Sequence, residues 1–127
     1  MRLKDDFFNI LSSEPTDNGI KCRVSLNPSH LIYRAHFPGA PITPGVCLLQ
    51  MVTEILEQHY TGQTFELNTA LDMKFKKTIT PDIQPVFILR GLLFHDDGLF
   101  KVNVVIEDDN EEQLARMTLD YNVQNAQ

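Results

Sequence analysis

The segment HFPGAPITPGV, residues 36–46, combines residue types that fix a backbone with one that carries acid–base chemistry. Its prolines fix φ and remove N–H donors, while Gly39 and Gly45 permit close backbone approach that a side chain would block. His36 contributes an imidazole, which titrates near neutral pH and can accept a proton from a bound substrate. The pattern therefore indicates a stiff loop that holds one base in a set place.

Gly45 stands immediately before an apolar run that predicts a helix from Val46 to about His59. The first N–H groups of a helix lack intrahelical partners and carry the positive end of its dipole. They could hydrogen-bond a carbonyl oxygen and stabilise an enolate-like charge on it. Two interpretations stay open at this point: a base beside an oxyanion site, or a stiff loop with a hydrogen-bonded histidine.

The predicted helix is apolar on most sides in its first half and amphipathic further along, so other structure must enclose it. Before it, residues 5–13 predict a short helix and residues 16–19, TDNG, predict a turn. Alternation over residues 20–26 predicts a half-buried strand, and residues 31–37 predict a second extended piece.

The second half of the chain predicts strands only, joined by the turn sequences DDG and DDNEE. The predicted strands are residues 71–80, 86–95, 99–107 and 113–123. Sequential hairpins together with one hydrophobic helix predict an α+β fold, in which a curved antiparallel sheet wraps around that helix. We expect one domain over residues 1–127, because the length fits a single domain and 43% of the residues are hydrophobic.

Composition excludes several function classes. The net charge of −6 argues against nucleic acid as a partner, because phosphate binding needs a basic face. No apolar run reaches the roughly 18 residues of a membrane span, and the first residues lack a signal-peptide core, so we expect a cytoplasmic protein. Cys22 and Cys47 sit in apolar patterns and are predicted to be reduced core residues. We expect no metal and no cofactor, since neither metal-ligand spacing nor a phosphate-cradling glycine loop occurs.

The segment HFPGAPITPGV resembles the signature of the β-hydroxyacyl-acyl-carrier-protein dehydratases of fatty acid synthesis, a family of hot-dog fold enzymes. Their pattern is roughly His-Phe-Pro-Gly-x-Pro-x-x-Pro-Gly-Val, and nearly every fixed position is matched. Residues 73–82, MKFKKTITPD, are similar to a second family strand, although a glycine before Asp82 is missing. The resemblance implies a hot-dog fold and a dimer with acyl tunnels near the subunit interface. It also implies that the histidine of one subunit works with an acidic residue on the helix of the other.

One departure from the family concerns the second catalytic residue. The family carries Glu or Asp at the helix position where this chain has Gln50, and Glu54 stands one helical turn later. Dehydration of a 3-hydroxyacyl thioester removes a proton at C2 and expels the 3-hydroxyl as water. An amide can hold that hydroxyl but cannot supply a proton, and losing a general acid typically costs on the order of 10²- to 10⁴-fold in rate.

Three hypotheses account for Gln50. In the first, dehydration persists and Glu54 is the acid, because a residue four positions on shares the helix face about 6 Å away. In the second, the chain is half of a heterodimer and His36 works with a carboxylate of a homologous partner. In the third, the chain binds acyl chains without dehydrating them, or is a thioesterase in which Gln50 positions water.

We favour a dehydratase-like protein that acts on a 3-hydroxyacyl chain carried by acyl carrier protein or coenzyme A. His36 would be the base, the backbone of Gly45 and Val46 would polarise the thioester carbonyl, and Gln50 would orient the hydroxyl. Homodimer, heterodimer and higher oligomer all stay open. The predicted substrate-binding residues are Phe37, Pro38, Gly39, Ile42, Leu49 and Phe75, with Met51 as a further tunnel residue.

A basic patch could recruit the acidic carrier protein despite the negative net charge. Its candidates are Arg34, Lys74, Lys76 and Lys77. The alternative is an ordinary solvated strand face. The remaining histidines, His30, His59 and His95, are predicted to lie at the surface, at helix ends or in turns rather than to act as ligands.

Overall fold

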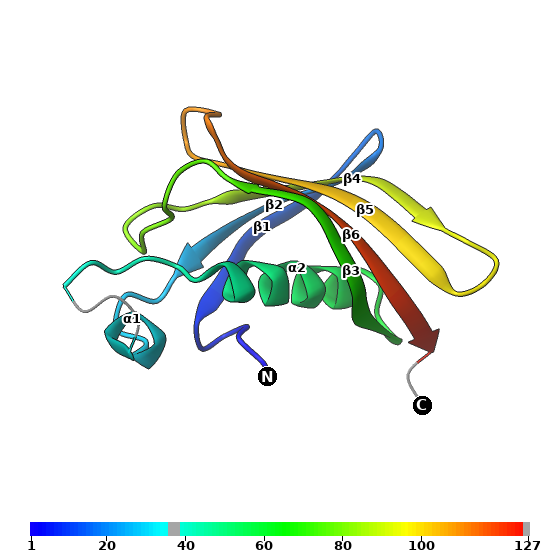
Figure 1. Cartoon of the computed structure of the whole chain (residues 1–127), viewed down its shortest axis with the longest axis horizontal. Coiled ribbons are helices and arrows are strands. Elements are labelled where there is room, and N and C mark those ends of the chain that lie inside the picture. Colours follow the sequence, from blue (N-terminus) through cyan, green and yellow to red (C-terminus); the bar gives the residue numbers. More distant parts are fainter. Residues whose placement is uncertain (36–38, 126–127) are drawn as a thin grey trace.

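The computed structural model describes residues 1–35 and 39–125. Its centre is one helix, α2, which lies under a six-stranded antiparallel sheet that curves over it (Figure 1). The strand order in the sheet is β1-β2-β4-β5-β6-β3, so β1 and β3 are its edges. The elements are β1 (Phe8–Thr16), β2 (Gly19–Leu26), α1 (Leu31–Ala35), α2 (Gly45–His59), β3 (Gln63–Phe75), β4 (Val86–Phe94), β5 (Leu99–Glu107) and β6 (Gln113–Asn125). The predicted α+β hot-dog architecture is confirmed.

Helix α2 holds the core together. Its buried apolar side chains are Cys47, Leu48, Met51, Val52, Ile55 and Leu56. Full burial of such a side chain contributes about 1.5–3 kcal/mol, so the inward face of this helix is a main source of folding free energy. The helix ends at His59, and the N–H of the following residue, Tyr60, donates to the carbonyl of Leu56. Gly62 then reverses the chain at φ 85°. The predicted helix is confirmed.

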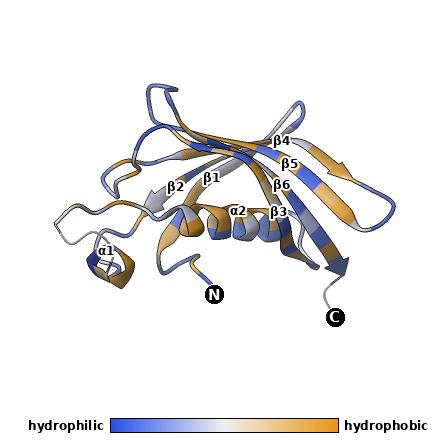
Figure 2. Ribbon diagram, in the orientation of Figure 1, coloured by the Kyte–Doolittle hydropathy of each residue, from blue (hydrophilic) through white to orange (hydrophobic). Residues whose placement is uncertain are grey.

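The strands show the alternation that the sequence predicts. In β2 every second side chain is buried, and in Figure 2 the strands change between hydrophobic and hydrophilic colours along their length while the connecting turns are hydrophilic. The predicted turns at residues 16–19, 96–98 and 108–112 connect β1 to β2, β4 to β5 and β5 to β6. Cys22 and Cys47 are buried free thiols, as predicted.

The predicted helix over residues 5–13 is wrong, because β1 begins at Phe8. Residues 5–7 form a tight turn in which Asp5 has φ 69° and donates its N–H to the carbonyl of Phe8 at 2.7 Å. The following residues pair with β2, where Phe8 lies opposite Leu26. Pairing with a later strand therefore overrides the helix-like local pattern.

The predicted extended piece over residues 31–37 is also wrong in its described part, since Leu31–Ala35 forms the helix α1. The chain enters this helix through a turn in which Ser29 N–H donates to the side chain of Asn27. The ring Nδ1 of His30 accepts the N–H of Ile32 at 3.1 Å and so caps the first turn. A side-chain cap thus starts a helix in a sequence whose residues favour strands.

The predicted strand over residues 71–80 is shifted. Strand β3 begins earlier, at Gln63, and ends at Phe75. Two register shifts against β6, after Leu67 and after Leu71, bend it. Beyond Phe75 the N–H groups of Lys76 and Lys77 both turn to the carbonyl of Leu114, which ends the regular ladder.

Among the described residues, no helix is long and apolar enough to cross a membrane. In residues 1–35 and 39–125, no three His, Cys, Asp or Glu side chains are grouped so that they could hold a metal ion.

Candidate functional site

A mostly apolar cavity of about 310 Å³ lies beside the first turn of α2. It is lined by Ile42, Thr43, Gly45, Leu48, Phe75, Lys76, Lys77, Thr78 and Ile79. The structure therefore brings together five of the sequence-predicted site residues: Ile42, Gly45, Phe75, Lys76 and Lys77. Its lining joins the end of the proline-glycine segment to the end of strand β3, which are far apart in the sequence.

The N-terminus of α2 opens on this cavity. Pro44 is extended, with ψ 144°, and its carbonyl accepts the first helical bonds from the N–H groups of Cys47 and Leu48. The amides of Gly45 and Val46 come before those bonds, and in the described part of the chain no side chain caps them. Uncapped amides at the positive end of a helix dipole can bind a carbonyl or enolate oxygen. The side chain of Val46 is 64% exposed and points away from the core.

Phe75 forms one wall of the cavity against Gly45. A Cβ placed on Gly45 would lie 3.0 Å from the ring carbon Cζ of Phe75, which is closer than ordinary packing. Phe75 is 49% exposed, so its ring separates the cavity from solvent at the edge of the sheet. A side chain at position 45 would therefore push the ring away from the start of the helix.

A buried pair of hydroxyls borders the cavity. The Tyr33 hydroxyl and Thr43 Oγ1 are 2.8 Å apart, and the backbone N–H of Thr43 donates to the carbonyl of Ile79. These contacts tie together both ends of the segment that contains His36, Phe37 and Pro38. Those three predicted site residues lie outside the described part of the chain. Gly39, which follows them, has φ 83°, where glycine is favoured.

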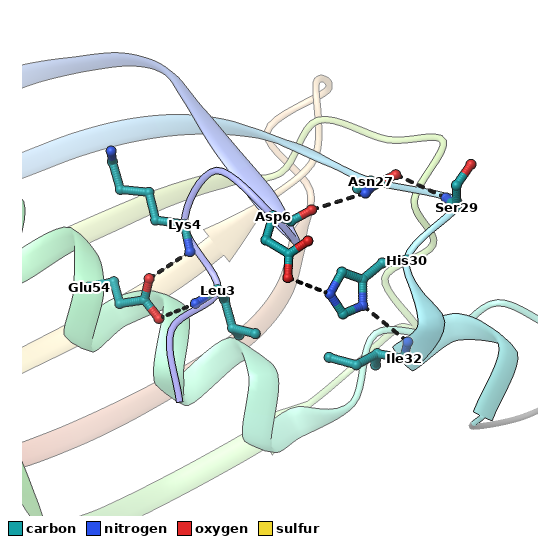
Figure 3. A network of polar contacts seen from close by, with 8 residues as sticks. All are labelled: Leu3, Lys4, Asp6, Asn27, Ser29, His30, Ile32 and Glu54. Atoms are coloured by element: carbon teal, nitrogen blue, oxygen red, sulfur yellow. Dashed lines mark hydrogen bonds and ion pairs between the residues drawn. The ribbon is translucent and has the colours of Figure 1, made fainter.

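Gln50 and Glu54 share one face of α2, as their spacing predicts, but both bind the N-terminal segment, and Figure 3 shows the bonds of Glu54. The Glu54 carboxylate accepts the N–H of Leu3 at 2.7 Å through Oε2 and the N–H of Lys4 at 2.7 Å through Oε1. The Gln50 side-chain amide donates to Glu54 Oε2 and to the carbonyl of Met1, both at 2.8 Å. Glu54 is only 3% exposed.

This arrangement gives Glu54 a structural task. Three N–H donors converge on its carboxylate, which compensates its burial. To act as the proton donor of the first hypothesis, Glu54 would have to exchange these bonds for contact with the substrate. Neither Gln50 nor Glu54 lines the cavity beside α2.

The N-terminal segment is held at a second place as well. The Asp6 carboxylate lies 3.0 Å from His30 Nε2, and the backbone carbonyl of Asp6 accepts the side chain of Asn27 (Figure 3). The ring of Phe7 stacks on Tyr33 with centroids 5.2 Å apart. His30 is therefore part of the framework beside α1.

The predicted basic residues are exposed, but they are not equivalent. Lys76 and Lys77 line the cavity, whereas Arg34 and Lys74 lie outside it. Lys77 forms an ion pair with Glu112, and this hydrogen bond raises the pKa of the Lys77 ammonium group. Because the Lys77 charge is already paired, Lys76 is the better placed of the two to meet an anionic group at the cavity mouth.

The Tyr33 hydroxyl and the Cys47 thiol stay protonated near neutral pH. Burial raises the pKa of the Tyr33 hydroxyl to about 12, although its hydrogen bond with Thr43 acts in the opposite direction. Burial also raises the pKa of the Cys47 thiol, which makes it a poor nucleophile. Both groups can therefore act as hydrogen-bond partners but not as bases near neutral pH.

Sequence reasoning missed several of the residues that line this cavity. Of the predicted tunnel residues, Met51 lies in the core and Leu49 is partly buried against it, and neither lines the cavity. The missed lining residues are Thr43, Leu48, Thr78 and Ile79. The signal that could identify Thr43 is its hydroxyl within the proline-glycine segment. Its partner Tyr33, however, lies in a segment that the sequence predicts to be extended.

Comparison with solved structures identifies the fold. The chain matches the dehydratase heterocomplex ApeI:P from Xenorhabdus doucetiae with a TM-score of 0.67 and 16% identity, covering 89% of this chain and 96% of that chain. It also matches a hypothetical thioesterase with coenzyme A from Streptococcus pneumoniae TIGR4, with a TM-score of 0.65 and 10% identity over 98% of this chain and 94% of that chain. At these identities the likeness shows the fold alone, and this fold is the hot-dog fold.

Sequence comparisons assign the family. The ApeI-like family, described as ApeI dehydratase, matches residues 12–118, so the chain belongs to the ApeI-like dehydratases. A 3-hydroxyacyl-acyl-carrier-protein dehydratase FabZ from Lactobacillus helveticus is 24% identical over 70% of this chain and 65% of that protein. The FabZ of Lactiplantibacillus plantarum is 30% identical over 46% of this chain and 42% of that protein. The chain thus spans less than two thirds of the length of these relatives.

Replacement of Glu54 tests its structural role. In Glu54→Gln one carboxylate oxygen becomes an N–H₂ group, which would face a backbone N–H of Leu3 or Lys4 instead of accepting from it. We expect the free energy of unfolding to fall by about 1–3 kcal/mol. Amide hydrogen exchange of Leu3 and Lys4 should accelerate. The matched control is Glu66→Gln at an exposed position, which should change neither quantity. Unchanged exchange at Leu3 and Lys4 in Glu54→Gln would contradict the structural role.

The buried Tyr33 predicts a pH dependence of stability. Tyrosine in the unfolded chain ionises near pH 10, whereas burial raises the pKa of Tyr33 to about 12 in the folded chain. The contribution of this group is therefore fully present below about pH 10 and is lost as the pH rises towards 12. In Tyr33→Phe the decline of the unfolding free energy across this range should be shallower, as measured by denaturant titration at several pH values. An equal decline in both proteins would show that Tyr33 ionises freely in the fold.

Proposed function

We propose that this protein binds 3-hydroxyacyl thioesters in the cavity beside α2 and takes part in their dehydration. The observation that carries the proposal is the position of the cavity, where the signature segment ends and the uncapped N-terminus of α2 begins. Its apolar lining fits an acyl chain, and the amides of Gly45 and Val46 would receive the thioester carbonyl oxygen. Membership of a dehydratase family supports this chemistry.

The proton balance of the reaction assigns the central role to His36. The imidazole would take the proton from C2, while the helix amides stabilise the negative charge that develops on the carbonyl oxygen. The 3-hydroxyl needs one proton to leave as water, and the imidazolium formed in the first step holds such a proton. Gln50 cannot supply it, and Glu54 is occupied by Leu3 and Lys4. Dehydration by this chain alone would therefore use His36 as both acceptor and donor.

The carrier of the acyl group is proposed to be an acidic acyl carrier protein or coenzyme A. Either brings an anionic phosphopantetheine or nucleotide group to the mouth of the cavity, where Lys76 lies. Lys74 and Arg34 are exposed nearby candidates for contact with an acidic carrier surface. Such contacts mainly raise the rate of association and weaken as salt is added.

A second candidate function is that of one subunit in a two-chain dehydratase. The observation that favours it is the engagement of both Gln50 and Glu54 by the N-terminal segment, so that neither side chain is free to donate a proton to a neighbouring site. A homologous partner would then provide the carboxylate that works with His36. The ApeI:P structure is described as a heterocomplex, which makes a second hot-dog chain a reasonable partner to test.

Turnover by the isolated protein separates these candidates. The protein is incubated with a 3-hydroxyacyl thioester on acyl carrier protein, and enoyl product and released thiol are followed in the same sample. The single-chain proposal predicts enoyl product, with a loss of at least about 10²-fold in His36→Ala and an unchanged thermal midpoint. The control is His95→Ala, an exposed turn histidine that should retain full activity. Carrier binding without product favours the two-chain candidate, whereas thiol release without enoyl product indicates a thioesterase and contradicts both.

The variant Gln50→Glu tests whether a family-like acid can be restored. The new carboxylate would face the carboxylate of Glu54 and the carbonyl of Met1, with no donor to either. We expect a loss of unfolding free energy of about 1–3 kcal/mol and no large gain in turnover. The double variant Gln50→Glu/Glu54→Gln, which places one amide beside one carboxylate again, should recover part of the stability. A gain of a hundredfold or more in the single variant would instead mean that the native site lacks only its acid.

A further inference from the structure

We propose that Thr43 selects oxygenated acyl chains: its hydroxyl, oriented by Tyr33, donates a hydrogen bond to an oxygen atom of the ligand in the cavity beside α2. The inference rests on the proposed function in one respect, namely that this cavity receives the acyl thioester. It goes further by naming which feature of the chain is recognised and by which residue.

The hydroxyls of Tyr33 and Thr43 carry two hydrogens between them. The two hydroxyls are 2.8 Å apart, so one donates and the other accepts, and one hydroxyl hydrogen is left over. Tyr33 is only 4% exposed and does not line the cavity. A leftover hydrogen on Tyr33 would therefore be buried with no partner among the described residues, which is costly. Within the described part of the chain this favours Tyr33 as the donor, so that Thr43 keeps its own hydrogen.

Thr43 lies at the wall of the cavity. Its side chain is 5% exposed, and the residue lines the cavity. Its backbone N–H is bound to the carbonyl of Ile79, and the ring of Phe7 stacks on Tyr33, so both partners are held in position. In this proposal the leftover hydrogen faces the cavity, where a ligand can reach it at little conformational cost.

The Thr43 hydroxyl stands in a mostly apolar cavity. The apolar walls come from Ile42, Leu48, Phe75 and Ile79, which offer no side-chain hydrogen bond, whereas the other polar lining residues, Lys76, Lys77 and Thr78, are exposed to water. In such a site a polar group strongly disfavours a ligand that leaves it unpaired, because it has lost water without gaining a partner. A saturated chain would leave Thr43 unpaired, whereas a 3-hydroxyacyl chain carries an oxygen close to the thioester that the helix N-terminus receives.

The competing explanation is that Tyr33 and Thr43 only close the loop that they flank. A purely structural pair affects stability but not the choice of ligand. The two explanations separate when the hydroxyls are removed singly and together. Thr43→Val leaves the Tyr33 hydroxyl buried and unpaired, while Tyr33→Phe/Thr43→Val replaces the pair by two apolar groups of similar shape and should recover much of the stability.

The experiment measures binding, so that it does not depend on turnover. The probes are a 3-hydroxyacyl and a saturated acyl thioester of N-acetylcysteamine with equal chain length, titrated into the full protein by calorimetry. His36→Ala serves as the common background, which prevents conversion of the probe. The variants are Thr43→Val, Thr43→Ser, Tyr33→Phe and the double variant, each with its denaturation midpoint. Tyr33 acts through Thr43 and is a positioning residue.

We expect the background protein to prefer the 3-hydroxyacyl probe by about tenfold, the worth of one buried hydrogen bond. Thr43→Val and the double variant should bind both probes equally, even where the double variant regains stability. Thr43→Ser should keep the preference, and Tyr33→Phe should reduce it. Loss of the preference in a protein that never forms enoyl product would support the inference while refuting catalysis by the lone chain. Equal binding by the background protein, a preference that survives Thr43→Val, or no binding of either probe would each overturn it.

Discussion

The buried carboxylate of Glu54 is the constraint on which the arrangement around α2 depends. A carboxylate that is 3% exposed needs hydrogen-bond donors in place of water, and here they come from Leu3, Lys4 and Gln50. The chain before β1 must therefore lie across α2, and β1 begins immediately after it, at the edge of the sheet. One buried carboxylate thus ties the chain before β1 to one face of the central helix.

The same constraint decides how the helix can contribute to chemistry. The family resemblance would place an acid at position 50, yet an amide is what can donate to Glu54 and to the carbonyl of Met1 together. Gln50 therefore satisfies a structural need that a carboxylate could not meet. In the proposed function, the amides that begin α2 and the histidine of the signature segment act on the thioester, while the middle of the helix anchors the chain before β1.

Sequence periodicity predicted the elements whose burial follows from local pattern. Helix α2, β2 and the three strands after residue 85 belong to this group. Periodicity predicts the wrong element at residues 5–13, where pairing with β2 overrides the local preference. It also does so at residues 31–35, where a side-chain cap by His30 favours a helix. Of the residues predicted for the site, Ile42 and Gly45 of the proline-glycine signature line one side of the cavity, and Phe75 lines another side. The Glu54 bonds join residues about fifty positions apart, and no local pattern encodes such contacts.

The cavity has one rigid side and one side that depends on its neighbours. Thr43 and the first turn of α2 are held by the core, whereas Phe75 stands at the end of β3, an edge strand. Leu67 and Leu71 on the same strand are exposed apolar residues, and a bare apolar edge in water is unfavourable. In the dimer that the family resemblance implies, a partner at this edge would restrict the Phe75 ring. Assembly would then shape the wall of the proposed acyl site while leaving the proposed hydrogen bond at Thr43 unchanged.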